Sequence, residues 1–527
     1  MKKIIITFLA LITIAAIFYN CIRLEKFDYV IKNGKVVDGT GNPWYKADIG
    51  IIGDKIAEIG LIPEEKGKMV IDAKGKVVSP GFIDIHTHTE GVAKDPTAHN
   101  YIMQGVTTVI AGNCGGSRIS LKDFFKKIEK QGIALNFASL VGHGSVRDTV
   151  MGNEAREPTE EELEEMKKFV EKEMKAGAVG LSTGLEYTPG VYSKTDEIIE
   201  LAKVVSRYGG FYASHIRDEE AKVVESIEEA IEIGEKANIP VEVSHFKIFG
   251  VERWGHSKIT VSLINETRKK GIDVTVDQYP YTAASTGLVI LFPPWALEGE
   301  EWKERIKNPE LKKEIKEYII YKIMHEYAGN DLNRIQIANY PEDTSIEGKG
   351  LKDILEMKEK EVTPDNAAEL VLELILEKND AVYHAMSEED VERIIKNPAT
   401  MHASDGHITE MNIGIPHPRN YGTFPRVLAE YVREKGIITL EEAIRKMTSM
   451  AASRIGIKDA GIISVDKRAD IVVFDPLTIR DKATFEKPHQ YPEGIEYVLV
   501  NGEIVVDHGT ITGKLPGKII YGPGKEK

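Results

Sequence analysis

Short apolar runs that end at a polar residue recur through the middle of this chain, and amphipathic stretches lie between several of them. An apolar run of this kind, bounded by turn residues, is typical of a buried strand, whereas apolar positions three and four apart predict a helix. Helical spacing is present in 160–176, 195–208, 219–237 and 261–270. The predicted strands are 82–86, 107–111, 135–141, 178–182, 211–214, 241–244, 273–276 and 400–404.

Eight strands that alternate with helices predict an α/β fold, a (β/α)8 TIM-like barrel over residues 80–455. A doubly wound sheet is the alternative. Polar candidate residues follow many different strands, which favours the C-terminal face of a barrel. Residues 293–398 interrupt the alternation and are too long for a plain loop. Their charged amphipathic stretches predict a helical insertion that either covers the barrel mouth or serves packing alone.

All-β patterns bracket the predicted barrel. An Asn-Gly pair at 33–34 and a Gly-Asp pair at 53–54 separate apolar runs within residues 27–79, and both pairs are hairpin signals. Similar apolar runs recur within residues 456–527. We therefore expect one small β-sandwich that is built from both ends of the chain.

The first 26 residues have a different pattern. Two lysines precede an uncharged, mostly apolar run at 4–19. This pattern predicts a signal or membrane-anchor segment, with a buried core helix as the alternative. We expect a membrane-anchored or exported protein, attached through 4–19, with its catalytic part outside the cytoplasm. Basic residues beyond the run leave the cytoplasmic side open.

Composition narrows the function classes. The 527 residues are 42% hydrophobic and 29% charged, which suits a large globular enzyme. The net charge of -15 argues against nucleic-acid binding, because no basic surface dominates. The two cysteines lie in very different contexts, so no disulfide framework is implied.

Metal-binding residue types follow several of the predicted strands. His86 and His88 leave the first strand with a spacing that places them on one face, where they can share a metal. Cys114 follows the second strand in a Gly-rich loop, and His215 and His245 follow the fifth and sixth. A thiolate and two imidazoles make a zinc centre with an open fourth position. The alternatives are a buried free cysteine and ordinary core histidines.

Asp405 follows the eighth predicted strand and would face the same barrel mouth. A carboxylate there can take a proton from a metal-bound water and return it to a leaving amine. Asp405 is therefore the candidate catalytic residue.

Taken together, these motifs resemble the N-acyl-D-amino-acid deacylase (D-aminoacylase) family of the amidohydrolase superfamily. The resemblance covers nearly everything from about residue 28 to 518. It implies one tightly bound Zn²⁺ on Cys114, His215 and His245. A second, weaker metal position would involve His86 and His88. The matching stretches are 81–88, 105–109, 112–115, 181–187, 279–281, 404–406, 417–419 and 421–427.

The resemblance also implies a binding site for the substrate's free carboxylate at Lys247, Arg419 and Tyr279, with Tyr187 and Ser285 lining the pocket. A guanidinium fork and an ammonium suit a carboxylate. The alternative for Lys247 and Arg419 is a surface salt bridge.

The activity implied by the resemblance is zinc-dependent hydrolysis of the linear amide of N-acyl-D-amino acids, which releases a carboxylate and a free D-amino acid. Two alternatives stay open within enzymes: a dipeptidase with D-residue preference, or another amidohydrolase acting on a carboxylate-bearing amide. Outside enzymes, the alternative is a membrane-tethered binding protein on an inactive barrel. It would predict that metal ligands have been lost, whereas Cys114, His215, His245 and Asp405 are all present. The loop at 406–418 departs from the family's usual shorter loop, so the side-chain preference stays open.

Overall fold

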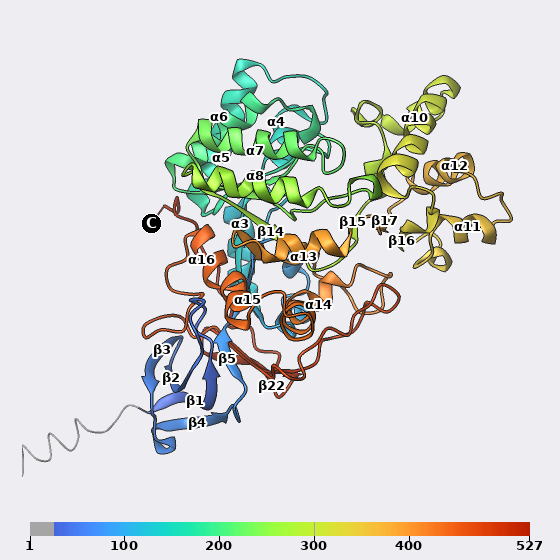
Figure 1. Cartoon of the computed structure of the whole chain (residues 1–527). Helices are drawn as coiled ribbons and strands as arrows, with labels where there is room; N and C mark the ends of the chain where they lie inside the picture. The colour runs from blue at the N-terminus through green and yellow to red at the C-terminus, as the bar shows by residue number, and fades with distance from the viewer. Residues whose placement is uncertain (1–25, 300, 527) are drawn as a thin grey trace, which may run out of the picture.

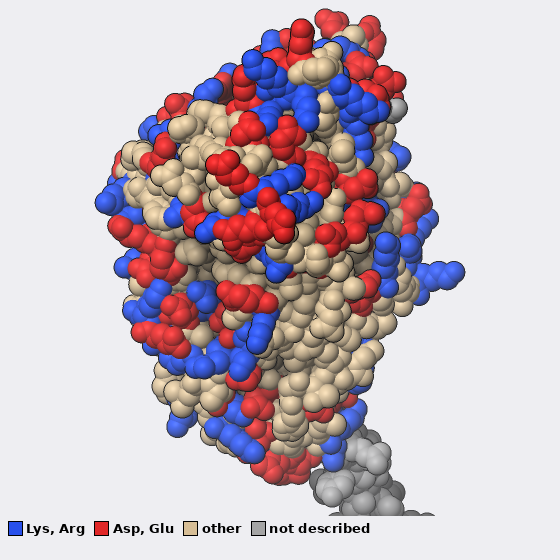
Figure 2. Space-filling view, turned by 90° about the vertical axis from the view of Figure 1, so that its right-hand side faces the viewer, with Lys and Arg blue, Asp and Glu red and all other residues tan. Residues whose placement is uncertain are grey.

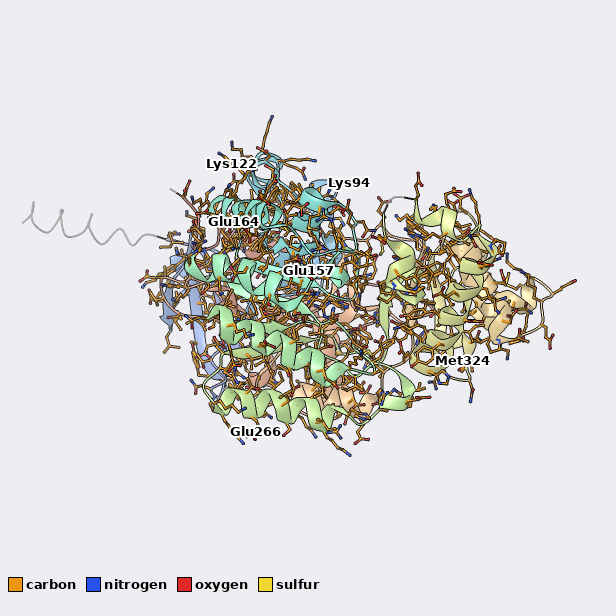
Figure 3. All side chains as sticks on the ribbon, turned by 90° about the horizontal axis from the view of Figure 1, so that it is seen from above. Lys94, Lys122, Glu157, Glu164, Glu266 and Met324 are labelled. Carbon is orange, nitrogen blue, oxygen red and sulfur yellow. The ribbon has the colours of Figure 1, made fainter. Side chains whose placement is uncertain are left out.

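The computed structural model describes residues 26–299 and 301–526. Figure 1 shows a barrel with helices around it, a β-sheet formed near one end of the barrel (blue strands β1 to β5), and a separate lobe to one side (yellow). The lobe is the segment that interrupts the barrel, and Figure 3 shows it beside the barrel helices when the molecule is seen from above.

The barrel has eight principal strands, and each overlaps a strand predicted from the sequence. Parallel ladders join them in two sheets, of order β6-β8-β9 and β10-β11-β12-β13-β14-β18. Val179 N donates to Ser139 O at 3.0 Å and Asp405 N donates to His86 O at 2.9 Å, and these bonds link the two sheets at both seams. The strands are β6 (Phe82–Asp84), β8 (Val106–Ala111), β9 (Asn136–Ser139), β11 (Gly180–Gly184), β12 (Phe211–His215), β13 (Val241–Val243), β14 (Val274–Gln278) and β18 (Thr400–His402), with the short β10 (Val141–Gly142) beside β11.

Helices cover the outside of these strands, and each buries one apolar stripe. In α5 (Glu160–Ala176), Met166, Val170 and Met174 recur at helical spacing and are buried. A reciprocal capping box between Thr159 and Glu162 fixes where α5 begins. The other covering helices include α3 (Leu121–Gln131), α4 (His143–Met151), α6 (Thr195–Arg207), α7 (Val223–Ala237), α8 (Ser257–Lys269), α13 (Glu388–Lys396), α15 (Leu440–Met447) and α16 (Ser449–Ile455). The predicted (β/α)8 barrel is confirmed.

Both ends of the described chain contribute to one nine-stranded sheet of order β23-β22-β21-β20-β5-β1-β2-β3, with β4 paired to β1. Ile49, Val473 and Leu499 are buried in the core that its strands enclose. The strands are β1 (Phe27–Val36), β2 (Tyr45–Ile52), β3 (Lys55–Gly60), β4 (Gly67–Asp72), β5 (Val77–Pro80), β20 (Ile471–Phe474), β21 (Ile495–Val500), β22 (Glu503–Asp507) and β23 (Thr510–Ile511).

The Asn33-Gly34 pair is not a hairpin turn. It is an irregularity inside β1, whose two halves pair with β4 and β5 on one side while β2 runs along the other. Asn33 has φ 58°, its backbone N–H donates to Asp48 and its side chain donates to Asp72. An Asn-Gly pair suits any tight bend that needs a left-handed backbone conformation, and here that bend is a bulge within a strand.

Beyond β23 the chain leaves this sheet and lies against the barrel. Gly517 N donates to Ile133 O at 2.8 Å, Phe137 N donates to Lys518 O at 2.9 Å, and Gly522 N donates to Gly177 O at 2.8 Å. The last residues therefore extend the backbone pairing of the barrel's third strand and tie the two parts of the molecule together.

The lobe between β14 and β18 has its own apolar core, which includes Ile319, Leu355 and Val371. Besides helices it contains a three-stranded antiparallel sheet of order β15-β17-β16. This sheet was not predicted. The elements are β15 (Ala284–Thr286), α9 (Trp302–Arg305), α10 (Pro309–Tyr321), η7 (Lys322–Tyr327), β16 (Ile335–Asn339), α11 (Leu351–Met357), α12 (Pro364–Leu374) and β17 (Asp380–Tyr383).

The predicted membrane localisation is corrected. Within residues 26–299 and 301–526, no helix is long and apolar enough to cross a bilayer. The run at 4–19, on which the prediction of an anchored or exported protein rested, lies outside the described residues. On the face seen in Figure 2, basic and acidic side chains of the described residues are interspersed.

Candidate metal centre and substrate cavity

The candidate metal ligands converge at the C-terminal ends of the barrel strands. Cys114 Sγ lies 3.4 Å from His86 Nε2 and 3.5 Å from His245 Nε2. The donor atoms of Cys114, His215 and His245 lie within 4.8 Å of one another, and each residue offers one. The same holds for a second group, which is His86, His88, Cys114 and Asp405. Cys114 belongs to both groups, so two adjacent metal positions would share its sulfur.

The backbone at this site is held in an uncommon conformation. Cys114, His245 and Asp405 have φ values of 51°, 34° and 50°, in the left-handed region that non-glycine residues rarely adopt. Two glycines allow the path around Cys114. A Cβ added at Gly112 would lie 2.3 Å from a backbone oxygen, and one at Gly115 would lie 2.7 Å from a backbone nitrogen. The Gly-rich loop is therefore required for the thiol to reach the histidines.

Carboxylates behind the histidines orient the imidazole rings. Asp277 Oδ2 lies 3.2 Å from His86 Nδ1, and a Glu219 carboxylate oxygen lies 3.0 Å from His245 Nδ1. Partners of this kind fix the tautomer and the ring orientation of metal-binding histidines. The sequence analysis missed both carboxylates. Asp277 directly follows the apolar run of β14, and Glu219 follows the fifth predicted strand in the same loop as His215, so each had a positional signal.

A third carboxylate approaches His215. Glu186 Oε2 lies 3.1 Å from His215 Nε2. The other ring nitrogen, Nδ1, is buried and has no hydrogen-bond partner among the described residues. A buried ring nitrogen without a partner fits a metal ligand.

Electrostatics favour a thiolate in this cluster. Burial raises the pKa of the Cys114 thiol, but the attraction of His86 and His245 outweighs burial and holds this pKa well below its usual range. For His215, burial lowers the pKa, but Glu219 and Cys114 outweigh burial and raise this pKa to about 10. In the metal-free site the thiolate is therefore matched by protonated imidazole.

Asp405 lies between the metal ligands and the cationic side of the site. Its Oδ1 is 3.1 Å from His88 Nε2, and its Oδ2 is 2.8 Å from Arg419 Nη1. Burial raises the pKa of this carboxyl, but Arg419 and His86 outweigh burial and hold the pKa well below its usual range. Asp405 is thus an ionised acceptor at neutral pH, next to both candidate metal positions.

The predicted carboxylate-binding residues surround one inner cavity. Lys247 Nζ is 2.5 Å from a Glu219 oxygen, and the Arg419 guanidinium lies 4.8 Å from the centre of the Tyr279 ring. Lys247 and Arg419 are 6% and 3% exposed, so neither forms a surface salt bridge. Arg419 Nη2 also donates to Ser285 O at 3.3 Å. The structure therefore brings both cations to the metal ligands.

Two hollows that share lining residues border the cluster. The inner cavity has a volume of ≈ 30 Å³, and its walls include Lys247, Tyr279 and Arg419. The outer cavity is ≈ 690 Å³ and is lined in part by the lobe, through residues such as Ala338 and Asp380. Tyr187, His245, Ser285, Thr286, Asp405 and Arg419 line both. The lobe thus forms a wall of the outer cavity.

Two further polar residues have structural partners of their own. His143 Nε2 lies 2.8 Å from Glu197, and Arg217 forms a forked pair with Glu229 at 2.8 and 2.9 Å. Neither His143 nor Arg217 lines the inner cavity.

Comparison with known proteins shows the family to which this chain belongs. A model described as "Amidohydrolase family" matches residues 69–259 and 361–506. A D-aminoacylase of Alcaligenes xylosoxydans xylosoxydans is 34% identical over 523 residues, which cover 94% of this chain and 98% of that protein. This chain belongs to the D-aminoacylases of the amidohydrolase family. The resemblance seen in the sequence motifs is confirmed.

Solved structures agree with this family and fold. An N-acyl-D-glutamate deacylase of Bordetella bronchiseptica, complexed with zinc and a phosphonate mimic of the tetrahedral intermediate, is similar with a TM-score of 0.81 and 32% identity. The alignment covers 94% of this chain and 100% of that one. A D-aminoacylase studied for its binuclear metal centre, with one-metal activation and second-metal attenuation, has a TM-score of 0.80, 34% identity and the same coverage.

Proposed function

We propose that this D-aminoacylase family member is a zinc-dependent hydrolase that cleaves the amide bond of N-acyl-D-amino acids to a carboxylate and a free D-amino acid. The observation that carries the proposal is the juxtaposition of two sites. Candidate metal ligands, among them His215 and His245, and two buried cations, Lys247 and Arg419, line the same inner cavity. Such a cavity suits an amide that has a carboxylate close by. The D-configuration is taken from the relatives named above.

The donor set fits zinc. Cys114, His215 and His245 offer one soft sulfur and two imidazole nitrogens, which zinc prefers and which Mg²⁺ and Ca²⁺ do not. We assign the tightly bound zinc to these three residues. His86 and His88 would form the weaker second position, next to Cys114 and Asp405. Bound zinc would polarise the substrate carbonyl and acidify a water molecule.

Asp405 carries the proton in this proposal. Its carboxylate accepts a proton from the attacking water and then delivers it to the amide nitrogen as the C–N bond breaks. The low pKa of Asp405 makes the carboxylate available as an acceptor at neutral pH. Its hydrogen bond with His88 and its ion pair with Arg419 fix both oxygens of the carboxylate.

Lys247, Arg419 and Tyr279 hold the substrate carboxylate. An incoming carboxylate would share Arg419 with Asp405 and Lys247 with Glu219, because each cation now pairs with one of these groups. Tyr187 and Ser285 line both the inner and the outer cavity. Anchoring the carboxylate places the scissile amide at the metal side of the cavity, which lowers the entropic cost of reaction.

The test is hydrolysis of N-acetyl-D- and N-acetyl-L-amino acids by the full chain with added zinc. We expect turnover of the D-enantiomers and dependence on zinc. Arg419→Ala should raise KM and also lower kcat, because Asp405 loses its ion pair. Dipeptides with a C-terminal D-residue form a second arm, which tests the dipeptidase alternative. No hydrolysis of either enantiomer by zinc-loaded protein would refute the deacylase proposal, and hydrolysis of the dipeptides alone would replace it.

A further inference from the structure

The inner cavity has a wall that the reaction described so far does not use. Besides Lys247 and Arg419, this cavity is lined by the aromatic side chains of Phe249, Tyr327 and Tyr383 and by the carboxyl group of Glu220. With the amide at the metal and the carboxylate at the cations, the remaining substituent of the substrate's Cα faces this wall. The wall therefore meets the side chain of the amino acid.

Glu220 is the unusual group in this wall. It is 2% exposed, and its Oε2 is buried without a hydrogen-bond partner among the described residues. A buried carboxyl oxygen without a donor costs free energy that a suitable ligand can recover. Aromatic walls that end in such an oxygen suit a substrate side chain with an apolar stem and a donor at its tip.

The charges around Glu220 favour a cation over an anion. Glu186 borders the same cavity, and Asp218 and Glu326 lie close behind. Lys322 is the nearest cation, but its Nζ lies 2.5 Å from Glu326 and 3.9 Å from Glu220. Its charge is shared among Glu220, Glu186 and Glu326, so a single ammonium group faces three carboxyl groups. Lys322 and Glu326 belong to η7, which Met324 marks in Figure 3.

A second basic group near this wall is already paired with a carboxylate. Arg217 lines a neighbouring side cavity of ≈ 210 Å³, but its guanidinium forms the forked pair with Glu229 described above. Among the described residues, the side chains near Glu220 therefore include more carboxyl groups than free cations.

The side cavity gives a long side chain room. The inner cavity alone is ≈ 30 Å³, too small for more than a short substituent. Glu186, Tyr187 and Ile290 line both the inner cavity and the side cavity, so the side cavity, which Lys322 also lines, is the adjoining space for a long side chain.

From this arrangement we infer that the enzyme selects N-acyl-D-amino acids with a basic side chain, such as D-lysine, and that Glu220 is the residue that determines this selection. The inference rests on the proposed deacylase function. Burial, together with the negative charge of Glu186, raises the pKa of the Glu220 carboxyl well above its usual range. Glu220→Gln keeps the shape of the side chain and cannot carry its negative charge, so this variant is expected to fold.

The experiment compares N-acetyl-D-lysine with N-acetyl-D-norleucine, which has the same stem without the ammonium group. We expect kcat/KM of the wild-type enzyme to favour the lysine substrate by about tenfold or more, the usual effect of one hydrogen bond to a charged group. Glu220→Gln should reduce this ratio by about tenfold. Glu252→Gln removes the same charge from a nearby exposed position and should leave the ratio unchanged.

Three results would overturn the inference: a wild-type ratio of one or less, an unchanged ratio in Glu220→Gln, or faster turnover of N-acetyl-D-glutamate than of the norleucine substrate. If the enzyme hydrolyses none of these compounds, the proposed function fails separately. In that case, calorimetry measures the affinities of the wild-type protein for free D-lysine and D-norleucine, and their comparison tests the selection of a basic side chain. Equal affinities would refute it, and tighter binding of D-lysine would support it.

Discussion

Glu219 contacts both the candidate metal ligand His245 and Lys247, one of the proposed carboxylate-binding cations, and replacing it with Gln tests the connection between the two sites. A carboxylate oxygen of Glu219 lies 2.5 Å from Lys247 Nζ. A Glu219 oxygen also lies 3.0 Å from His245 Nδ1. Burial raises the pKa of Glu219, but Lys247 and His245 outweigh burial and hold it well below its usual range, so the group is ionised at neutral pH. Gln keeps the shape and removes the charge.

Two losses follow from the substitution. Lys247 is 6% exposed and would remain buried without its counter-ion, and breaking a buried pair in this way costs about 3–5 kcal/mol of unfolding free energy. His245 would lose the anionic partner that orients its ring, and loss of such a partner weakens metal binding by about 10–100-fold. Both effects should therefore appear in one variant.

The assay measures the free energy of unfolding in urea for the metal-free protein and zinc affinity by competition with a chelator. Glu229→Gln is the matched control, because Glu229 forms a partly buried pair with Arg217 and contacts none of the candidate metal ligands. We expect the control to lose about 1 kcal/mol or less and to keep its zinc affinity. If Glu219→Gln behaves like the control in both measurements, the proposed link between cation site and metal site is wrong.

Three further changes test the site. Asp405→Asn should lower kcat by about 10²–10⁴-fold, since the amide can neither accept nor return the proton, while metal analysis shows zinc still bound; unchanged kcat would exclude Asp405 as the proton carrier. Gly115→Ala should lose more than about 1 kcal/mol of unfolding free energy and bind less zinc, because φ is 74° and the added Cβ meets backbone at 2.7 Å; a stable, zinc-replete variant would contradict this. Zinc affinity should rise with pH between about 7 and 9, by up to tenfold per unit for each displaced proton. The sign follows from His215, whose pKa of about 10 means that zinc must displace a proton at neutral pH. Calorimetry in buffers of different ionisation enthalpy measures this release, and its absence would refute the protonation scheme.

The barrel and the residues at its mouth could be predicted from the sequence for the same physical reason. Strands buried on both faces read as continuous apolar runs, and the carboxyl ends of parallel strands meet at one edge. Thus Cys114, His215, His245 and Asp405, each placed at a predicted strand end, lie together in the structure.

What the sequence did not reveal depends on contacts between distant segments. His86 pairs with Asp277 across 191 positions of the chain, and no local pattern marks that pairing. Glu220 is one of several acidic residues in its stretch, and only the fold separates it from the exposed ones. The small sheet of the lobe was missed because strands such as β15 and β17 are too short to establish a period of two.

The seam that closes the barrel is also part of the site. Asp405 N donates to the backbone oxygen of His86, and Ser404 N donates to Asp84 Oδ1 at 3.0 Å, so the last strand joins the first at the metal cluster. The left-handed φ of Asp405 is held by this pairing, which aims its carboxylate at His88. Since a strained conformation persists only where surrounding contacts fix it, the geometry of the proposed proton carrier depends on barrel closure. This coupling explains why the proposed catalytic and metal-binding side chains stand on strand ends, while the residues proposed to face the substrate's side chain come from the loops and the lobe, where the sequence can vary without opening the barrel.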